Sequence, residues 1–175
     1  MGERYQRMAS DTYIEATSAY WEGAPAERKA IDEKSREELQ ERLAQLPPDK
    51  VMAANYIASS ARYWYDPEYD AGWLWEDMVV NNDLISHLFG NIFLGYDMFE
   101  NMNKLDVPVL LVLGKHDYVI PPTIWQDSYD SLTDFTRILL EKSGHTPQLE
   151  DPAAFDKILL EWVAEKVDKL NSVQF

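Results

Sequence analysis

The sequence contains no cysteine. Disulfides, thiolate metal sites and cysteine nucleophiles all need that residue, so each of them is excluded. Basic residues are also scarce, since 16 Lys and Arg stand against 31 Asp and Glu for a net charge of −15. A chain this acidic is a poor ligand for polyanions, and nucleic-acid binding is therefore not expected.

Long apolar runs are absent as well. No stretch of the sequence approaches about 18 consecutive apolar residues, so no membrane-spanning helix is predicted. The N-terminal sequence MGERYQRMASD has no apolar segment after its charges, which predicts no signal peptide. An acidic chain without cysteine fits a cytoplasmic location, although export also permits such a composition. No trio of His, Asp and Glu has metal-ligand spacing, so neither a metal nor another cofactor is expected.

What the sequence does contain divides into two parts. Residues 1–103 are rich in helical patterns and aromatic side chains, with no convincing strand. Helices are predicted here over residues 11–20, 26–34, 36–46, 49–65 and 83–88, the third of them from a capping box formed by Ser35 and Glu38. Residues 66–82 are predicted to be an ordered aromatic loop. No flexible linker separates this part from the next, so the two are expected to pack together.

Residues 104–175 alternate between strand and helix. The run Val109–Leu113 is continuously apolar, which is typical of a strand covered on both faces. A second strand is predicted over residues 136–140, and helices over 121–131 and 152–167. Alternation of this kind favours an α/β fold with a parallel sheet.

A polar residue follows each predicted strand. Asp117 comes shortly after Gly114, and His145 comes directly after Gly144. The carboxyl ends of neighbouring parallel strands meet at one edge of the sheet, so we expect this acid and this histidine to lie side by side. They would form two thirds of a nucleophilic triad.

These two segments resemble the C-terminal part of the α/β-hydrolase fold. The family patterns G-x-x-D-x-x-x-P and G-H-x-x-x-x-E-x-P are matched, respectively, by Gly114, Asp117 and Pro121 and by Gly144, His145, Glu150 and Pro152. The Trp-rich segment YWYDPEYDAGWLWE is similar to the helical cap of the proline-iminopeptidase-like branch. The resemblance implies an incomplete α/β domain, with a helical cap over residues 1–103 and the last two β/α units of the core over residues 104–175.

The sequence departs from the family in one respect. It contains neither the G-x-S-x-G nucleophile elbow nor an H-G-G-type oxyanion loop. None of Ser59, Ser60, Ser86 and Ser143 is predicted to occupy a strained turn between a strand and a helix. We therefore expect the nucleophile, the oxyanion hole and most of the sheet to be missing from this chain.

The resemblance implies a role for each catalytic candidate. His145 would act as the general base toward a serine hydroxyl, and Asp117 would fix the tautomer of its imidazole. The alternatives are that Asp117 is an ordinary turn residue and that His145 caps the last helix.

Substrate-binding candidates come from the aromatic loop. Trp64, Trp73 and Trp75 would wall an apolar pocket, or would simply hold the cap helices together. Glu76 would pair with the free amino group of a peptide substrate, or would be a surface residue.

Three functions follow from these patterns. The leading hypothesis is the C-terminal portion of a serine hydrolase that cleaves esters or small peptides, esterase-like or aminopeptidase-like, and that is inactive without a half carrying the serine. Its expected macromolecular partner is that N-terminal half or a second copy of the chain, because strand 109–113 would have an unpaired edge. The alternatives are a non-catalytic binding or oligomerisation module and, less favoured, a small helical protein whose β-part is coincidental.

Overall fold

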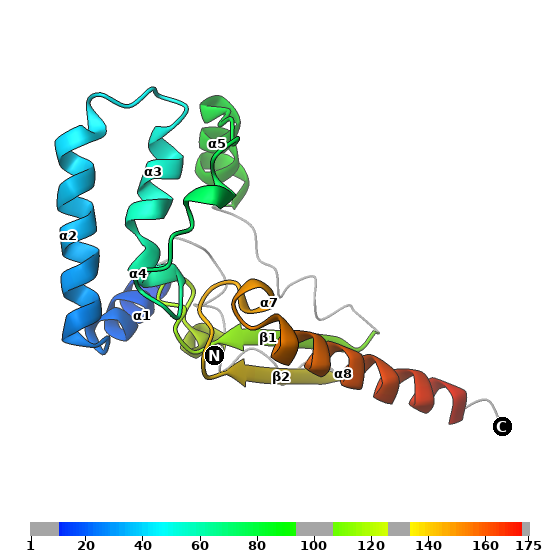
Figure 1. Ribbon diagram of the computed structural model, residues 1–175. Coiled ribbons are helices and arrows are strands. Elements are labelled where there is room, and N and C mark those ends of the chain that lie inside the picture. The colour runs from blue at the N-terminus through cyan, green and yellow to red at the C-terminus, as the bar shows by residue number, and fades with distance from the viewer. Residues whose placement is uncertain (1–10, 94–106, 126–133, 173–175) are drawn as a thin grey trace.

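A computed structural model describes residues 11–93, 107–125 and 134–172. Helices occupy the first of these ranges, and two parallel strands with a long helix occupy the rest (Figure 1). The mixed helical and parallel-strand architecture agrees with the α/β class predicted from the sequence. The boundary predicted between residues 103 and 104 lies outside the described residues.

The helical part is built around two helices that lie side by side. Helix α1 covers Asp11–Glu22, α2 Ala26–Leu43, α3 Val51–Ala58 and α4 Ser60–Tyr63. A small apolar cluster joins α2 to α3 through Leu39, Ala54 and Ala58. Figure 1 shows α2 and α3 alongside each other, with α4 at the end of the pair that is nearest to the strands.

The capping box predicted at Ser35 is wrong, because α2 runs through that position without a break. A serine inside a helix costs only a few tenths of a kcal/mol relative to alanine. Asp32 and Arg36 form an ion pair of 3.0 Å across the predicted break, one helical turn apart. The pairing favours a single helix, which ends at Leu43 rather than at Leu46.

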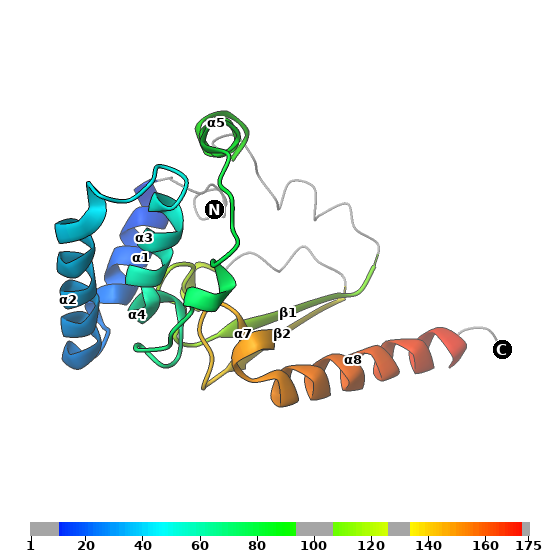
Figure 2. The ribbon, with the colours of Figure 1, turned by 45° about the horizontal axis from the view of Figure 1, so that its top comes forward.

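The aromatic loop contains short helical segments. A 3-10 helix, η1, covers Gly72–Leu74, and α5 covers Asn82–His87 with the side chain of Asn81 as its N-cap. A π-helix, η2, continues α5 over Leu88–Ile92. Figure 2 shows α5 set apart from the α1–α4 group.

Strands β1 (Val109–Gly114) and β2 (Phe135–Leu140) pair in parallel, with Val109 opposite Phe135 and Gly114 opposite Leu140. The arrows of both strands point toward the helical part in Figure 1, so the carboxyl ends of the strands face α1 and α4. The prediction that residues 109–113 are covered on both faces is wrong for the described structure, where they are only half-buried. Pairing with β2 occupies an edge of β1 and leaves its faces to be covered by helices, which within the described residues cover them only in part.

Two further helices follow β2. Helix α7 (Pro147–Glu150) was not predicted, and α8 covers Pro152–Ser172. Between the strands, the helix predicted from Pro121 begins as a 3-10 helix, η4, over Pro122–Trp125, and its remainder lies outside the described residues.

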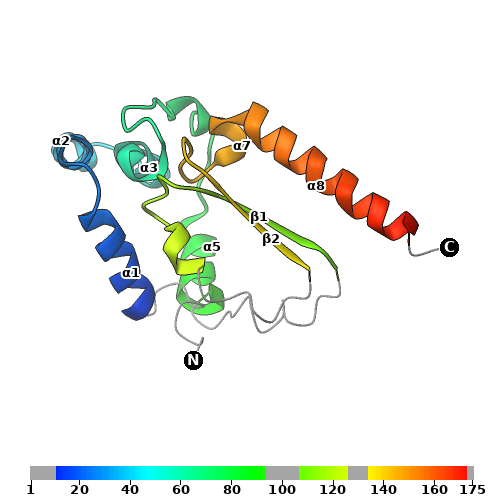
Figure 3. The same cartoon turned by 90° about the horizontal axis from the view of Figure 1, so that it is seen from below.

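The long helix α8 lies along the two strands (Figure 3). Trp162 donates from its indole nitrogen to the Thr136 hydroxyl at 3.2 Å, and Lys166 binds the Asp134 carboxylate. The apolar side chains of α8 are only partly covered, since Val163 is 42% exposed. No helix in the described ranges is both long and apolar enough to cross a bilayer.

Candidate active site

The structure brings Asp117 and His145 together as the sequence predicts. Asp117 lies in the loop after β1 and His145 in the loop after β2. The carboxylate oxygen Oδ2 of Asp117 lies 2.8 Å from the ring nitrogen Nδ1 of His145. Because an ionised carboxylate can only accept, Nδ1 donates its proton and Nε2 is left as the basic nitrogen. The geometry therefore suits a histidine that removes a proton from a neighbouring group.

The other oxygen of Asp117 fixes the carboxylate in place. Oδ1 accepts hydrogen bonds from the backbone nitrogens of Val119 and Ile120, at 2.9 and 2.8 Å. The Asp117 side chain is 10% exposed, whereas that of His145 is 34% exposed. The acid is thus held rigidly inside the protein while the imidazole remains accessible to a substrate.

The charges around the imidazole determine its protonation. Burial of the His145 ring lowers its pKa, but the hydrogen bond that the ring donates to Asp117 and the charges of Asp117 and Glu150 outweigh burial and raise the pKa above the ordinary 6.5. His116, on the acid loop, shows the opposite behaviour: burial and the charges of Arg28 and Lys115 lower its pKa. A raised pKa makes His145 the stronger base of the two.

The Glu150 carboxylate holds the histidine loop through hydrogen bonds to its backbone. One of its carboxylate oxygens accepts from the backbone nitrogens of Gly144 and Thr146, at 2.8 and 3.2 Å. The other accepts from the backbone nitrogen of Tyr65 at 2.6 Å. Sequence reasoning noted Glu150 as a motif position but gave it no role. Its three hydrogen bonds tie the two residues that flank His145 to the helical part.

The acid loop is held by tyrosines of α1. The Tyr13 hydroxyl donates to the carbonyl of Val119 at 2.8 Å, and the Tyr20 hydroxyl donates to the carbonyl of Lys115 at 2.6 Å. Between them the buried ring of Tyr118 packs against Tyr20, with ring centroids 5.3 Å apart. Neither tyrosine carries a sequence signal for this role, because their partners are backbone atoms roughly a hundred residues away.

The predicted substrate-binding residues fall into two groups. Trp75 stacks on Tyr56 at 4.7 Å, Tyr56 packs edge-on against Tyr63, and Tyr63 packs edge-on against the imidazole of His145 at 5.2 Å. A continuous series of rings therefore leads from Trp75 to the candidate base.

Trp64 and Trp73 belong to the second group. The Trp64 ring is buried against Tyr69 at 5.0 Å, and the indole nitrogen of Trp73 donates to the Tyr69 hydroxyl at 3.3 Å. Trp64 and Tyr69 also line a cavity of about 140 Å³ that Glu150 borders. Glu76 is exposed, and its backbone carbonyl accepts from Lys50 at 3.2 Å.

The described serines do not lie where a nucleophile is needed. Ser143 is fully buried next to Gly144, so no substrate can reach its hydroxyl. The Ser60 hydroxyl donates to the carbonyl of Ile57 within the helical part. Within the described residues, no three His, Asp or Glu side chains are grouped so that they could hold a metal ion.

Known proteins resemble this chain over part of their length. It is 32% identical over 147 residues to the AB hydrolase superfamily protein YclE of Bacillus subtilis (strain 168), a match that covers 83% of this chain and 52% of YclE. A shorter match, 32% identical over 68 residues, covers 39% of the chain and 22% of a pimeloyl-acyl-carrier-protein methyl ester esterase of Neisseria meningitidis serogroup A. Another, 30% identical over 66 residues, covers 37% of the chain and 21% of the probable aminopeptidase YbaC of Bacillus subtilis (strain 168). No protein-family model matches the chain.

Solved structures give the same picture of partial coverage. The crystal structure of VinJ matches 88% of this chain and 53% of its own, with a TM-score of 0.56 and 16% identity. The crystal structure of proline iminopeptidase from Mycobacterium smegmatis matches 88% of this chain and 52% of its own, with a TM-score of 0.54 and 19% identity. The chain thus spans about half the length of YclE and of both structures.

Proposed function

Because the chain belongs to the α/β-hydrolase superfamily, over about half the length of its relatives, we propose that it supplies the acid, the base and part of the cap of a serine hydrolase. The observation that carries the proposal is the 2.8 Å contact between Asp117 and His145 at the carboxyl ends of two parallel strands. Residues 1–103 then act as the cap and residues 104–175 as the last part of the core.

The reaction requires a hydroxyl nucleophile close to Nε2 of His145. The imidazole takes the hydroxyl proton as the oxygen attacks the substrate carbonyl, and it returns the proton to the departing alcohol or amine. Asp117 stabilises the imidazolium that exists between these steps. The sequence has no G-x-S-x-G motif, so the nucleophile comes from polypeptide outside these 175 residues.

Esters and small peptides are the substrate classes that the names of the relatives suggest for this chain. One matched relative is named as a methyl ester esterase and another as a probable aminopeptidase. The ring series from Trp75 to Tyr63 supplies an apolar wall beside His145, which suits an acyl or aromatic group next to the scissile carbonyl. Trp64 and Trp73, which contact Tyr69, stay candidates for substrate binding, and Glu76 stays the candidate for a substrate amino group. The cytoplasmic location likewise stays a prediction.

The most direct test uses a fluorophosphonate probe and a nitrophenyl ester. The 175-residue chain should neither react with the probe nor hydrolyse the ester. Covalent labelling of this chain would overturn the claim that its nucleophile lies elsewhere.

A chimera tests the positive claim. The part of YclE that this chain does not match is joined ahead of residue 1, and the joined protein should gain probe labelling and ester hydrolysis. Both should be lost in a His145→Ala variant. Activity that survives this change would contradict the role of His145 as the base.

Exposed apolar surface favours a partner polypeptide. Each strand pairs along one edge in the described sheet, and Leu160 of α8 is 68% exposed with Val167 at 48%. The proposed occupant is the polypeptide that carries the nucleophile, since relatives are about twice as long as the matched region. Sedimentation of the chain alone and with the rest of YclE tests this. If the chain sediments as a monomer at high concentration and does not bind the rest of YclE, the proposed partner is contradicted. Self-association of the chain would favour a binding or oligomerisation module.

A further inference from the structure

Adjacent carbonyls of one short segment bind both catalytic loops. The segment Ala61–Tyr65 comprises the last three residues of α4 and the two residues that follow it, at the end of α4 that faces the strands. The carbonyl of Arg62 accepts from the backbone nitrogen of Tyr118 at 3.0 Å, and the carbonyl of Tyr63 accepts from the backbone nitrogen of His145 at 2.6 Å. Two residues after Tyr63, the backbone nitrogen of Tyr65 donates to the carboxylate of Glu150.

The two loops meet at the same segment although they follow different strands. Tyr118 directly follows the acid Asp117, and His145 is the base itself. Since the two acceptor carbonyls belong to neighbouring residues, their separation depends only on the φ and ψ angles of Tyr63. The segment therefore sets the spacing between the acid loop and the histidine loop.

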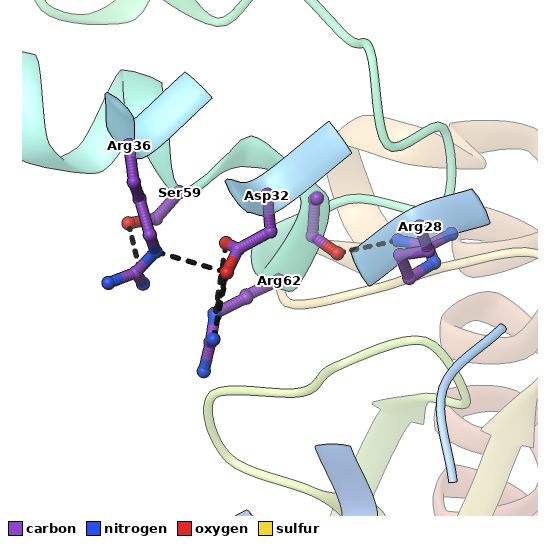
Figure 4. Close-up of polar contacts among 6 residues, drawn as sticks. Arg28, Asp32, Arg36, Ser59 and Arg62 are labelled. Atoms are coloured by element: carbon purple, nitrogen blue, oxygen red, sulfur yellow. Dashed lines mark hydrogen bonds and ion pairs between the residues drawn. The ribbon is translucent and has the colours of Figure 1, made fainter. Parts of the chain in front are cut away.

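A buried arginine holds the segment in place. Arg28 of α2 is 6% exposed. Its guanidinium donates to the carbonyls of Ala61 at 2.7 Å, Trp64 at 2.8 Å and Tyr65 at 2.5 Å. Figure 4 shows Arg28 directed at this end of α4, away from the cluster that Asp32, Arg36 and Arg62 form further along α2.

Arg28 also reaches the acid loop. Its guanidinium carbon lies 5.2 Å from the centre of the Tyr118 ring, which is within the range of a cation–π contact. The three carbonyls require N–H donors pointing in different directions, and the ring requires a cation above its face. A planar guanidinium meets both requirements, whereas the ammonium of lysine is a compact point charge on a thinner stem.

We propose that the segment Ala61–Tyr65 sets Asp117 against His145 and that Arg28 is the positioning residue that holds this segment. The inference rests on the proposed function, in that it concerns the same acid–base pair. It deepens that function by coupling the pair to α2, a helix of the cap. Any movement of α2 relative to α4 is then transmitted to both catalytic loops through Arg28.

The test compares two arginine-to-lysine changes on α2. Arg28→Lys removes the guanidinium from the backbone carbonyls. The matched control, Arg36→Lys, changes an arginine of the same helix that binds the side chains of Asp32 and Ser59 rather than backbone. Two quantities are measured by NMR in the 175-residue chain: the exchange rates of the Tyr118 and His145 backbone amides, and the pKa of the His145 ring.

The expected result is specific to the two loops. In Arg28→Lys both amides should exchange about tenfold faster or more, because the segment that carries their acceptor carbonyls loses its anchor. The pKa of His145 should fall toward its ordinary value as the contact with Asp117 loosens. In Arg36→Lys both quantities should stay as in the wild type, and amides of the α2–α3 interface should be equally protected in both variants.

Unchanged amides and an unchanged His145 pKa in a folded Arg28→Lys variant would overturn the inference. If that variant does not fold, Arg28→Gln takes its place, because one amide group has too few N–H donors for the three carbonyls, and a wild-type His145 pKa there would count equally against it. An Asp117→Asn variant separates the two proposals. If that change leaves the pKa of His145 where it was, the acid–base pair itself is absent and the proposed function fails, whatever Arg28 does.

Discussion

A Cβ atom on Gly114 would overlap the carbonyl oxygen of Gly144. These are the glycines that precede the candidate acid and the candidate base, and the first motif needs its glycine because the backbone of the second lies against it. Gly144 is tight on a second side, where its own Cβ would overlap the carbonyl oxygen of Tyr63. The strands and the helical part approach so closely here that a hydrogen is the largest side chain that fits.

Gly144→Ala should therefore destabilise the fold by about 3 kcal/mol, the upper end of the range for overpacked sites. The atoms in the way are backbone, which cannot move aside by changing rotamer. In a chain of this length the loss lowers the melting temperature by about 6–12 °C. Calorimetry or thermal circular dichroism measures it.

Gly90→Ala is the matched control, because a Cβ at Gly90 meets nothing within 4 Å. In that π-helical segment alanine should leave the melting temperature unchanged or raise it slightly, by up to about 1 kcal/mol in stability. Equal melting temperatures for the two alanine variants would contradict the close approach.

The two histidines of the candidate site should titrate on opposite sides of the ordinary value. Asp117 and Glu150 raise the pKa of His145 above 6.5, while burial and nearby cations lower the pKa of His116. Ring resonances followed by NMR from about pH 5 to about pH 8 measure both. In Asp117→Asn the pKa of His145 should fall and that of His116 should change little. The reverse order of the two pKa values in the wild type would show that the pair does not form.

The raised pKa of His145 has a definite consequence for stability. The folded state binds the proton more tightly than the unfolded state does. The resulting stabilisation is fully present below the unfolded pKa, near 6.5, and is lost as pH rises through the higher folded pKa. The unfolding free energy of the wild type should therefore fall across that window relative to Asp117→Asn, and denaturant titrations at a series of pH values measure this difference.

Asp32→Asn should cost about 3 kcal/mol of stability, the lower end for breaking a buried ion pair. The Asp32 carboxylate is 5% exposed and accepts from Arg62 with both oxygens, at 3.0 Å from Nε to each and 2.8 Å from Nη2. The neutral amide loses the charge that this arginine needs. Glu38→Gln on the same helix removes an exposed pair with Lys34 and should change stability by at most about 0.5 kcal/mol. Equal urea midpoints for these two variants would count against a stabilising role for Asp32.

Glu150→Gln should cost about 0.5–1.5 kcal/mol, the net contribution of a hydrogen bond, because these bonds are partly buried or exposed. The carboxylate accepts three backbone hydrogen bonds, and an amide nitrogen in place of one oxygen would face the nitrogen of Tyr65 or those of Gly144 and Thr146. Glu141→Gln is the control, because Glu141 pairs with Lys115 at the exposed surface nearby. A Glu150 variant as stable as the control would show that this carboxylate does not organise the loop.

The contact between Asp117 and His145 could be predicted from the sequence because the signals for it are local. Each follows a short apolar strand and a glycine, and the parallel order of the strands places both residues at one edge. The same logic could not find Arg28, which sits in the charged run AERKAIDEKSREE and looks like any solvated arginine. Its partners are backbone carbonyls 33 to 37 residues away, and backbone acceptors leave no trace in side-chain patterns.

The errors also have physical causes. The capping-box signal at Ser35 is real in isolation, but the ion pair of Asp32 with Arg36 continues the helix past it. The strand Val109–Gly114 has the composition of a strand that is covered on both faces, yet cover depends on what lies beside it. The sequence of a segment shows how apolar it is, whereas the elements that pack against it in the fold determine how much of its surface is buried.

The bonds that assemble the candidate site join parts of the chain that are far apart in sequence. Tyr65 and Glu150 are 85 residues apart, Tyr20 and Lys115 are 95, and Tyr13 and Val119 are 106. Closing each loop costs entropy before any contact is gained, and contacts of this span slow folding. The α2–α3 pair can form from local contacts, so it should gain its native hydrogen bonds early. Asp117 and His145 should come together in the last and slowest phase of folding.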